Sequence, residues 1–510
     1  MKKRTGPLAK LIMRRLGGSR RQVNVVRTDA PPRAGRGRET VVIGAGLAGL
    51  SAAVILAERG FDVTVLEKNS YIGGKAGSWS ARLADGFEVR IDHGFHGFFR
   101  QYYNLRMMLE RFRAASRLVP VEDYLICTLE HGRFSFRSTA LTPVLNMLSL
   151  RRSGVYRLAD MVRNRESRHL LEFLRYDPKR TFAEFDDMSF QEFSDRIGLP
   201  APMRIMFNTF SRSFFAEPRL MSTAEVMKSF HYYFLSNDLG LLYDYLEGDY
   251  EETLLAPARA HLERLGVRIF TSRTVQGIQR QGGRFRVAGF DCDSVVVAAD
   301  AAAARRIVEA SAFIGAEDPE SFERVRRLSS SGGYAVLRLW LDKPGGDEFP
   351  TFFSTDRVQL LDSVTFQHRI DRDSAAWARQ NGGSVLELHS YSLPGGAHDE
   401  GRIRDSLVQE MKMYVPQLQE ARIVHAHLQV RDDFTAFHTG MHRHRPGVTT
   451  RIPGLVLAGD WVETGLPAML MEAACTSAVL AANELLAAEG VQEEPVFSVP
   501  GKGLLAGGRT

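Results

Sequence analysis

The sequence predicts an α/β fold in which a nucleotide-binding domain is assembled from separated segments and a second domain combines a mixed sheet with helices. The first observation is a glycine-rich turn between two short β-rich runs near residue 44. The second is a buried run that ends in Gly-Asp near residue 460. The third is a series of apolar and alternating runs between residues 265 and 390. Together they predict a sheet whose strands come from both ends and the middle of the chain.

The composition is that of a globular protein. Of the 510 residues, 44% are hydrophobic and 25% charged, which excludes a largely disordered, collagen-like or coiled-coil chain. The three cysteines, Cys127, Cys292 and Cys475, are too far apart in sequence to suggest a disulfide framework or a thiolate zinc site. Such sparse cysteine is typical of a reducing compartment, so we expect a cytoplasmic protein.

The charge is concentrated in a basic leader, residues 1–38. Residues 1–39 hold 12 Lys or Arg and two acids, whereas the remainder holds 54 basic and 58 acidic groups. A nucleic-acid enzyme is disfavoured because its basic surface would be expected on the folded body. The leader lacks the apolar stretch of a signal peptide. A basic amphipathic helix from Pro7 would bind an anionic membrane surface, and a disordered leader is the alternative.

No segment has about 18 uninterrupted apolar residues. We therefore expect a protein that associates peripherally with the inner face of the cell membrane and does not span it.

A dinucleotide-binding motif follows the leader. Residues 39–43 and 61–67 are predicted to be strands, and the turn Gly44 to Gly49 opens the helix between them. The three glycines permit a tight turn, close approach of a pyrophosphate and close helix–strand packing, as in a Rossmann-type domain. The helix N-terminus would bind the pyrophosphate, and Glu67 would accept hydrogen bonds from a ribose diol.

Two later segments favour FAD over NAD. A second glycine pair, Gly73-Gly74, precedes Lys75 and can pass close to a cofactor. A strand predicted to end at Gly459-Asp460 precedes a helix expected from about Met469 to Ala488. An acid at a strand end and a second helix N-terminus suit the flavin's ribityl chain and pyrophosphate. No second GxGxxG occurs, so we expect no NADPH site and transfer of the electrons to a quinone or another acceptor.

Three β-rich runs, residues 265–270, 275–278 and 294–299, are expected to complete the cofactor domain, with Val275 beside the adenine. The predicted FAD site comprises Gly44, Ala45, Gly46, Leu47, Ala48, Gly49, Glu67, Lys68, Gly74, Lys75, Val275, Gly459, Asp460 and Met469. The predicted domains are FAD-binding segments 39–110, 251–330 and 447–490, a helical aromatic-rich part 111–250, a substrate-domain sheet 331–446 and a tail 491–510.

Residues 201–250 contain eleven aromatic residues, 22% against 10% for the whole chain. They are Phe207, Phe210, Phe214, Phe215, Phe230, Tyr232, Tyr233, Phe234, Tyr243, Tyr245 and Tyr250. These residues could line a tunnel for an apolar substrate or form an ordinary helical core.

The segments described above resemble the superfamily of FAD-dependent amine oxidases and carotenoid desaturases. Gly74-Lys75 with Ser78-Trp79 is similar to the plant-type carotene desaturases, because amine oxidases usually have arginine at Lys75. The stretches Asp92 to Leu105, Gly459 to Met469 and Val499 to Leu505 resemble the carotenoid phi-ring synthases, also called isorenieratene synthases. Met471-Glu-Ala-Ala-Cys475 departs from the Met-Glu-Gly-Ala of linear-carotene desaturases.

The resemblance implies an oxidoreductase that acts on CH–CH groups of a hydrophobic carotenoid. The flavin would accept a hydride from a β-ionone ring of β-carotene, a methyl group would shift to the neighbouring carbon, and proton loss would restore a double bond. Two two-electron oxidations per ring would give an aromatic, phi-type ring. The alternatives are a desaturase or isomerase of a linear carotene, an amine or porphyrinogen oxidase, and a non-catalytic lipid carrier.

His93 and His96 are the candidate catalytic residues. They could accept the ring proton, or they could hydrogen-bond backbone or flavin carbonyls without changing protonation. A metal site is not expected, because HxxH alone places no third ligand. Glu463 and Glu472 are expected to stabilise a helix N-terminus or face solvent. Five histidines are interpreted as loop and solvated surface: His425, His427, His438, His442 and His444.

Overall fold

The structure is a computed structural model that describes residues 22–23, 29–35, 37–83, 86–137, 139–143, 145–152, 165–395 and 399–506. The amphipathic helix predicted from Pro7 lies outside these residues.

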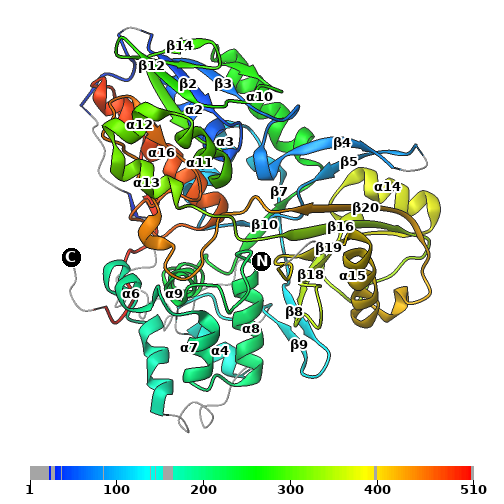
Figure 1. Cartoon of the computed structure of the whole chain (residues 1–510). Coiled ribbons are helices and arrows are strands. Elements are labelled where there is room, and N and C mark those ends of the chain that lie inside the picture. The colour runs from blue at the N-terminus through cyan, green and yellow to red at the C-terminus, as the bar shows by residue number, and fades with distance from the viewer. Residues whose placement is uncertain are drawn as a thin grey trace.

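Five parallel strands form the first sheet, in the order β11-β3-β2-β15-β21. They are β2 (Glu39–Ile43), β3 (Asp62–Leu66), β11 (Arg268–Phe270), β15 (Ser294–Val297) and β21 (Leu455–Leu457). Valines dominate the three central strands and are buried, as in parallel sheets that helices cover. The prediction that distant segments meet in one sheet is confirmed, and the sheet lies at the top of Figure 1.

Two helices lead from the carboxyl ends of strands in this sheet. They are α2 (Leu47–Glu58) and α16 (Leu470–Ala488), which pack against each other. By length and composition α16 is apolar enough to cross a membrane, but 67% of its most apolar window is buried inside the fold. This burial is that of a core helix.

One predicted strand of this sheet is wrong. Residues 275–277 are irregular, and β12 (Ile278–Gln281) pairs antiparallel with β13 (Arg284–Val287), which pairs with β14 (Phe290–Cys292). The reason is the turn at Gly282-Gly283, where both residues have positive φ, 56° and 85°. Such a glycine pair closes a tight hairpin, and the hairpin holds Ile278 opposite Val287.

A second sheet of seven strands has the order β20-β16-β19-β18-β17-β8-β9. Its strands are β8 (Leu125–Thr128), β9 (Gly132–Ser135), β16 (Tyr334–Leu341), β17 (Phe352–Thr355), β18 (Ser363–Phe366), β19 (Ser384–Ser390) and β20 (Ile423–Arg431). The alternating runs of the sequence become β16 and β19, which are antiparallel neighbours. His425 and His427 lie on β20, so their interpretation as loop residues is wrong.

Different elements cover the two faces of the second sheet. Leucines of β16 and β19 pack on α15 (Glu400–Tyr414) on one face. Trp340 and Val385 pack on α14 (Arg372–Asn381) and on the hairpin of β4 (Ser78–Arg82) and β5 (Glu88–Asp92) on the other.

A helical region lies below the first sheet and beside the second in Figure 1. It contains α4 (Leu145–Arg152), η3 (Arg165–Phe173), α6 (Pro178–Phe185), α7 (Phe190–Arg196), α8 (Ala201–Arg212), α9 (Thr223–Phe230) and η4 (His231–Leu235). Arg212 of α8 reaches the second sheet through an ion pair with Asp362, at 2.6 Å.

The smaller elements connect these parts. A three-stranded sheet joins β6 (Phe98–Phe99), β10 (Tyr243–Leu246) and β7 (Leu118–Pro120), and β1 (Gln22–Val23) pairs with β22 (Phe497–Ser498). The remaining helices are η1 (Gly74–Ala76), α3 (Tyr103–Arg111), η2 (Ala115–Arg117), η5 (Glu251–Leu255), α10 (Ala256–Arg264), α11 (Ala301–Glu309), α12 (Ala312–Glu317), α13 (Pro319–Arg326), η6 (Gln367–Arg369), η7 (Pro416–Leu418) and η8 (His442–His444).

Candidate active site

A cavity of about 550 Å³ lies where the two sheets and the helical region meet. One end is formed by the residues that follow the carboxyl ends of β2, β3, β15 and β21. The other end lies between α8 and η4 on one side and strands of the second sheet on the other. A ligand site at the carboxyl ends of parallel strands is the usual arrangement in open α/β sheets.

The first glycine turn has the geometry that the sequence predicts. Gly44 has φ of 103°, and a Cβ there would lie 2.7 Å from the Ala298 carbonyl oxygen. A Cβ on Gly49 would lie 1.9 Å from the Gly44 carbonyl oxygen. Gly46, the N-cap of α2, has only the Gly74 Cα within 4 Å of that position, and no side chain caps the helix. The amide end of α2 is therefore available to an anionic group.

Glu67 lies at the end of β3 and lines the cavity, although it is only 5% exposed. Its carboxylate accepts hydrogen bonds from the backbone N–H of Ala45 at 2.8 Å and of Asn69 at 2.9 Å, one on each oxygen. These bonds fix the carboxylate beside the glycine turn and leave each oxygen a lone pair for a diol. Lys68 lines the same wall and pairs with Asp300 at 3.0 Å.

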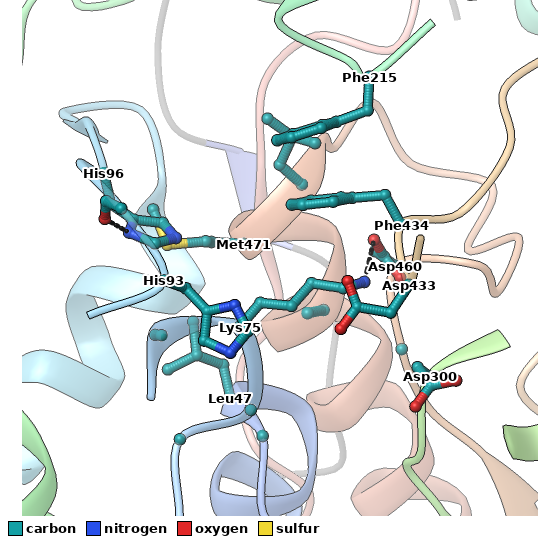
Figure 2. A pocket seen from close by; sticks show the side chains of 18 of the residues that line it. Leu47, Lys75, His93, His96, Phe215, Asp300, Asp433, Phe434, Asp460 and Met471 are labelled. Carbon is teal, nitrogen blue, oxygen red and sulfur yellow. Dashed lines mark hydrogen bonds and ion pairs between the residues drawn. The ribbon is translucent and has the colours of Figure 1, made fainter. Parts of the chain in front are cut away.

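The second glycine pair packs on the first turn. Gly73 donates its N–H to the Ala45 carbonyl at 2.7 Å, and a Cβ on Gly74 would lie 2.9 Å from the Gly46 Cα. Lys75 then extends across the cavity, with Nζ 3.9 Å from an Asp460 carboxylate oxygen and 4.5 Å from the ring centre of Phe434 (Figure 2).

Asp460 is held from both sides after β21. Its carboxylate accepts the Thr435 hydroxyl at 2.9 Å. The buried Arg445 guanidinium donates to the backbone carbonyls of Asp460, Trp461 and Val462 at 2.7, 3.2 and 3.0 Å. This segment is therefore fixed before any ligand binds.

Of the residues predicted to bind FAD, most line the cavity: Gly44, Gly46, Leu47, Ala48, Glu67, Lys68, Gly74, Lys75, Val275, Gly459 and Asp460. Ala45 and Gly49 do not line the cavity. Ala45 bonds Glu67 and Gly73, and Gly49 packs against the Gly44 carbonyl. Met469 is not at the cavity, since it is buried against Ser229. Leu470 has φ of 49°, and this turn directs Leu470 and Met471 to the cavity in its place.

These features fit a flavin dinucleotide. The amide end of α2 and that of α16 have no side-chain cap, a buried carboxylate stands at the end of β3, and an aspartate stands at the end of β21. The sequence missed Asp300, which follows β15 and caps α11. An acid after a β-rich run is the signal that identified Asp460, and it applies equally to Asp300.

His93 and His96 lie on the cavity wall near Lys75 and Met471 (Figure 2). The His96 Nδ1 donates to the Gly94 carbonyl at 2.7 Å, and burial lowers the pKa of His96 to about 4. The His93 Nδ1 is buried without a partner among the described residues, and burial lowers the pKa of His93 well below its usual range. Both rings are therefore neutral near pH 7, and the bond to Gly94 is of the kind expected for a structural role.

The aromatic residues of the 201–250 segment divide between the two interpretations left open. Six of the eleven line the cavity: Phe210, Phe214, Phe215, Tyr233, Phe234 and Tyr243. Others, such as Phe207 and Phe230, pack against each other in the helical core. Phe215 has φ of 60° and stacks face to face on Phe434, with centroids 3.4 Å apart (Figure 2).

Glu472, which the sequence singled out, has structural partners. The buried Glu472 carboxylate accepts the backbone N–H groups of Asn104 and Leu105, each at 2.9 Å, so it stabilises the N-terminus of α3. Within the described residues no group of three or more His, Cys, Asp or Glu side chains is placed to hold a metal ion.

Comparisons with known proteins agree with this geometry. The model of the flavin containing amine oxidoreductases matches residues 47–486. A carotenoid phi-ring synthase of Streptomyces griseus is 37% identical over 95% of each chain. Another, of Chlorobaculum tepidum, is 27% identical over 92% of this chain and 91% of its own. A solved structure of putrescine oxidase superimposes with a TM-score of 0.62 over 89% of this chain and 99% of its own, at 13% identity, which supports the fold.

Proposed function

Because the chain belongs to the family of flavin-containing amine oxidoreductases, we propose that this FAD-dependent oxidoreductase desaturates the β-ionone rings of β-carotene to aromatic, phi-type rings. The observation that carries the proposal is the 37% identity to a carotenoid phi-ring synthase over 95% of the chain. The cavity supports it, because its glycine turns adjoin a wall of aromatic side chains.

The cofactor would be held by residues that follow three strands of the first sheet, β2, β3 and β21. The amide end of α2 would bind the pyrophosphate, Glu67 the ribose and Asp460 the ribityl chain. When bound, FAD supplies the two-electron oxidation. The bonds of the Glu67 carboxylate to backbone amides and the bond of the Thr435 hydroxyl to the Asp460 carboxylate orient these carboxylates in advance.

The reaction balances without a methyl donor. Each ring loses four hydrogens in two two-electron oxidations, and one geminal methyl group moves to the adjacent carbon, so the carbon count is unchanged. The protein's part is to exclude water and to tolerate positive charge on the ring. Phe210, Phe214 and Tyr233 present aromatic rings to the cavity, and aromatic faces attract cations.

The surroundings of the reaction are part of the proposal. A carotenoid resides in a membrane, so we propose that the enzyme works at the membrane surface, to which the basic residues before position 39 would be attracted. A quinone in the same membrane would be a suitable electron acceptor.

The direct test is the pigment of cells that make β-carotene, with and without this protein. A product lighter by four hydrogens per modified ring, with all carbons retained, supports the proposal. Unchanged β-carotene in cells whose purified protein carries stoichiometric FAD would refute the ring reaction. Linear carotenes would then be supplied, since an enzyme acting on them is the second candidate. Methyl positions determined by NMR would distinguish phi rings from their isomers.

A further inference from the structure

A third histidine lies beside the two that the sequence identified. His389 is on β19, lines the cavity, and is largely buried. It packs against Gly94, which lies between His93 and His96 in the sequence. A Cβ on Gly94 would lie 2.9 Å from the His389 Cε1. The glycine, with φ of 128°, thus makes room for this ring. His389 therefore lies on the same wall of the cavity as His93 and His96.

A buried carboxylate orients the His389 ring. One oxygen of Glu387 accepts a hydrogen bond from His389 Nε2 at 2.9 Å and another from the Phe95 N–H at 2.8 Å. The other oxygen accepts from Nη2 and Nε of the buried Arg338, at 2.8 and 3.2 Å. Burial alone would raise the pKa of Glu387, but the Arg338 charge and the His389 bond lower it to about 2. Glu387 is therefore an anion, and His389 Nε2 carries the proton.

This arrangement leaves the other ring nitrogen of a neutral His389 as an acceptor. No residue that the structure describes donates a hydrogen bond to Nδ1, and the ring lines the cavity. We propose that His389 is the general base that accepts the ring proton, and that Glu387 is the positioning residue that holds it. The inference rests on the proposed function, because it assigns a role within that reaction.

The environment distinguishes His389 from its neighbours. The charged and titratable groups around it are the carboxylates of Glu387 and Asp92, the guanidinium of Arg338, the His96 imidazole, and the phenols of Tyr250 and Tyr391. Protonated His389 would face the Glu387 anion directly, at 2.9 Å. His96 donates to a backbone carbonyl instead, so an imidazolium there would feel the Glu387 charge without a hydrogen bond to it.

The proton transfer is balanced as follows. A hydride leaves the ring in the oxidation that FAD supplies, and the ring carbon becomes cationic. In the oxidation that includes the methyl shift, the geminal methyl group moves with its electron pair to this carbon and leaves the positive charge on the carbon that it left. A C–H bond on the carbon next to the positive charge then breaks, its electron pair forms the ring double bond, and the proton moves to His389 Nδ1. The imidazolium returns the proton to solvent between turnovers.

The test compares H389Q and E387Q with H427Q as the matched control. His427 lies on β20 of the same sheet and does not line the cavity. We expect H389Q to retain wild-type FAD content and visible spectrum while formation of aromatic product from β-carotene falls at least ~100-fold. We expect E387Q to lose about tenfold and to shift the acid limb of the pH–rate profile to lower pH. H427Q should match the wild type.

The outcomes are distinguishable. Product formation by H389Q within about threefold of the wild type overturns the inference and leaves the proposed function intact. If H389Q loses FAD, its activity says nothing about the base, and the pH–rate profile of E387Q becomes the test. An acid limb that is not shifted in E387Q overturns the inference. Restoration of H389G by added imidazole supports it. If the wild-type enzyme itself gives no aromatic product, the proposed function and the inference fail together.

Discussion

At the scale of single residues, Gly49 is the position where the least change has the largest expected effect. An added Cβ would lie 1.9 Å from the Gly44 carbonyl oxygen, which is a backbone atom of the turn between β2 and α2. We expect G49A to lower the free energy of unfolding by about 1–3 kcal/mol and to reduce FAD retention. Thermal unfolding and the flavin-to-protein ratio measure both effects.

A glycine in open surroundings provides the control. Gly447 has no atom within 4 Å of its Cβ position, so G447A should retain the stability and flavin content of the wild type. Wild-type stability and flavin content in G49A would contradict the packing argument.

Local motifs identified residues that the structure brings together at one end of the cavity. Gly44, Gly46 and Glu67 line it because turn, helix and strand are adjacent in sequence, and their geometry follows from a short segment. His389 and Phe434 could not be found in this way, since they reach the cavity only through strand pairing and loop packing over hundreds of residues. Met469 does not line the cavity but Leu470 does, and Leu470 has a positive φ that no sequence pattern indicates.

At the scale of elements, Glu472 joins α16 to α3. It bonds the Asn104 side chain as well as two backbone amides, and the Asn104 amide also donates to Thr476 and to the Phe497 carbonyl. Buried polar networks of this kind stabilise a structure only when all members are satisfied. The contact therefore fixes how two helices of the flavin side pack.

This network predicts a pH dependence of stability. Burial raises the pKa of Glu472 to about 8 from an ordinary value of 4.5. The folded state then binds a proton more tightly than the unfolded state, so the free energy of unfolding should fall as pH rises from 4.5 to 8. The slope approaches roughly 1.4 kcal/mol per pH unit within that interval.

Chemical denaturation across this pH range measures the effect, with E472Q as the matched variant. The uncharged glutamine should remove the Glu472 contribution to the slope. Identical pH profiles for E472Q and the wild type would show that Glu472 does not titrate differently in the two states.

Strand prediction succeeded where the pattern was long and local. β16 and β19 show eight and seven successive buried residues, and both were predicted from their apolar alternation. The strand predicted at residues 275–278 does not join the first sheet. The glycine pair at 282–283 closes a hairpin instead, in which Ile278 pairs with Val287. The parallel pairing of β8 with β17 has no local signal, because more than 200 residues separate the two strands.

At the scale of the whole molecule, the C-terminal segment fastens the flavin side to the helical region. Gly503 and Leu505 donate to the carbonyls of Tyr176 and Leu174 at 2.7 and 2.8 Å. His231 of η4 donates to the Pro500 carbonyl at 2.7 Å. These contacts follow α16 directly in the chain, so one short segment connects the cofactor site with the wall of the cavity.

Removing residues 497–506 should therefore loosen the helical region more than the flavin site. We expect faster cleavage by protease between residues 165 and 235, with FAD retention reduced less than the rate of product formation. Limited proteolysis with mass spectrometry measures this. K502A is the control, since its ion pair with Asp177 is partly exposed and contributes little. Unchanged cleavage in the truncated protein would contradict the fastening role.

The order of strands in the first sheet has a consequence for synthesis on the ribosome. β2 and β3 emerge early, but β15 receives its outer neighbour β21 only after about nine-tenths of the chain has been translated. Domains usually begin folding as they emerge from the ribosome, and contacts between distant segments form slowly. Asp460 and the amide end of α16 follow β21. The flavin site proposed above is thus incomplete in a nascent chain until β21 and α16 have been translated, and incorporation of the cofactor would report their synthesis.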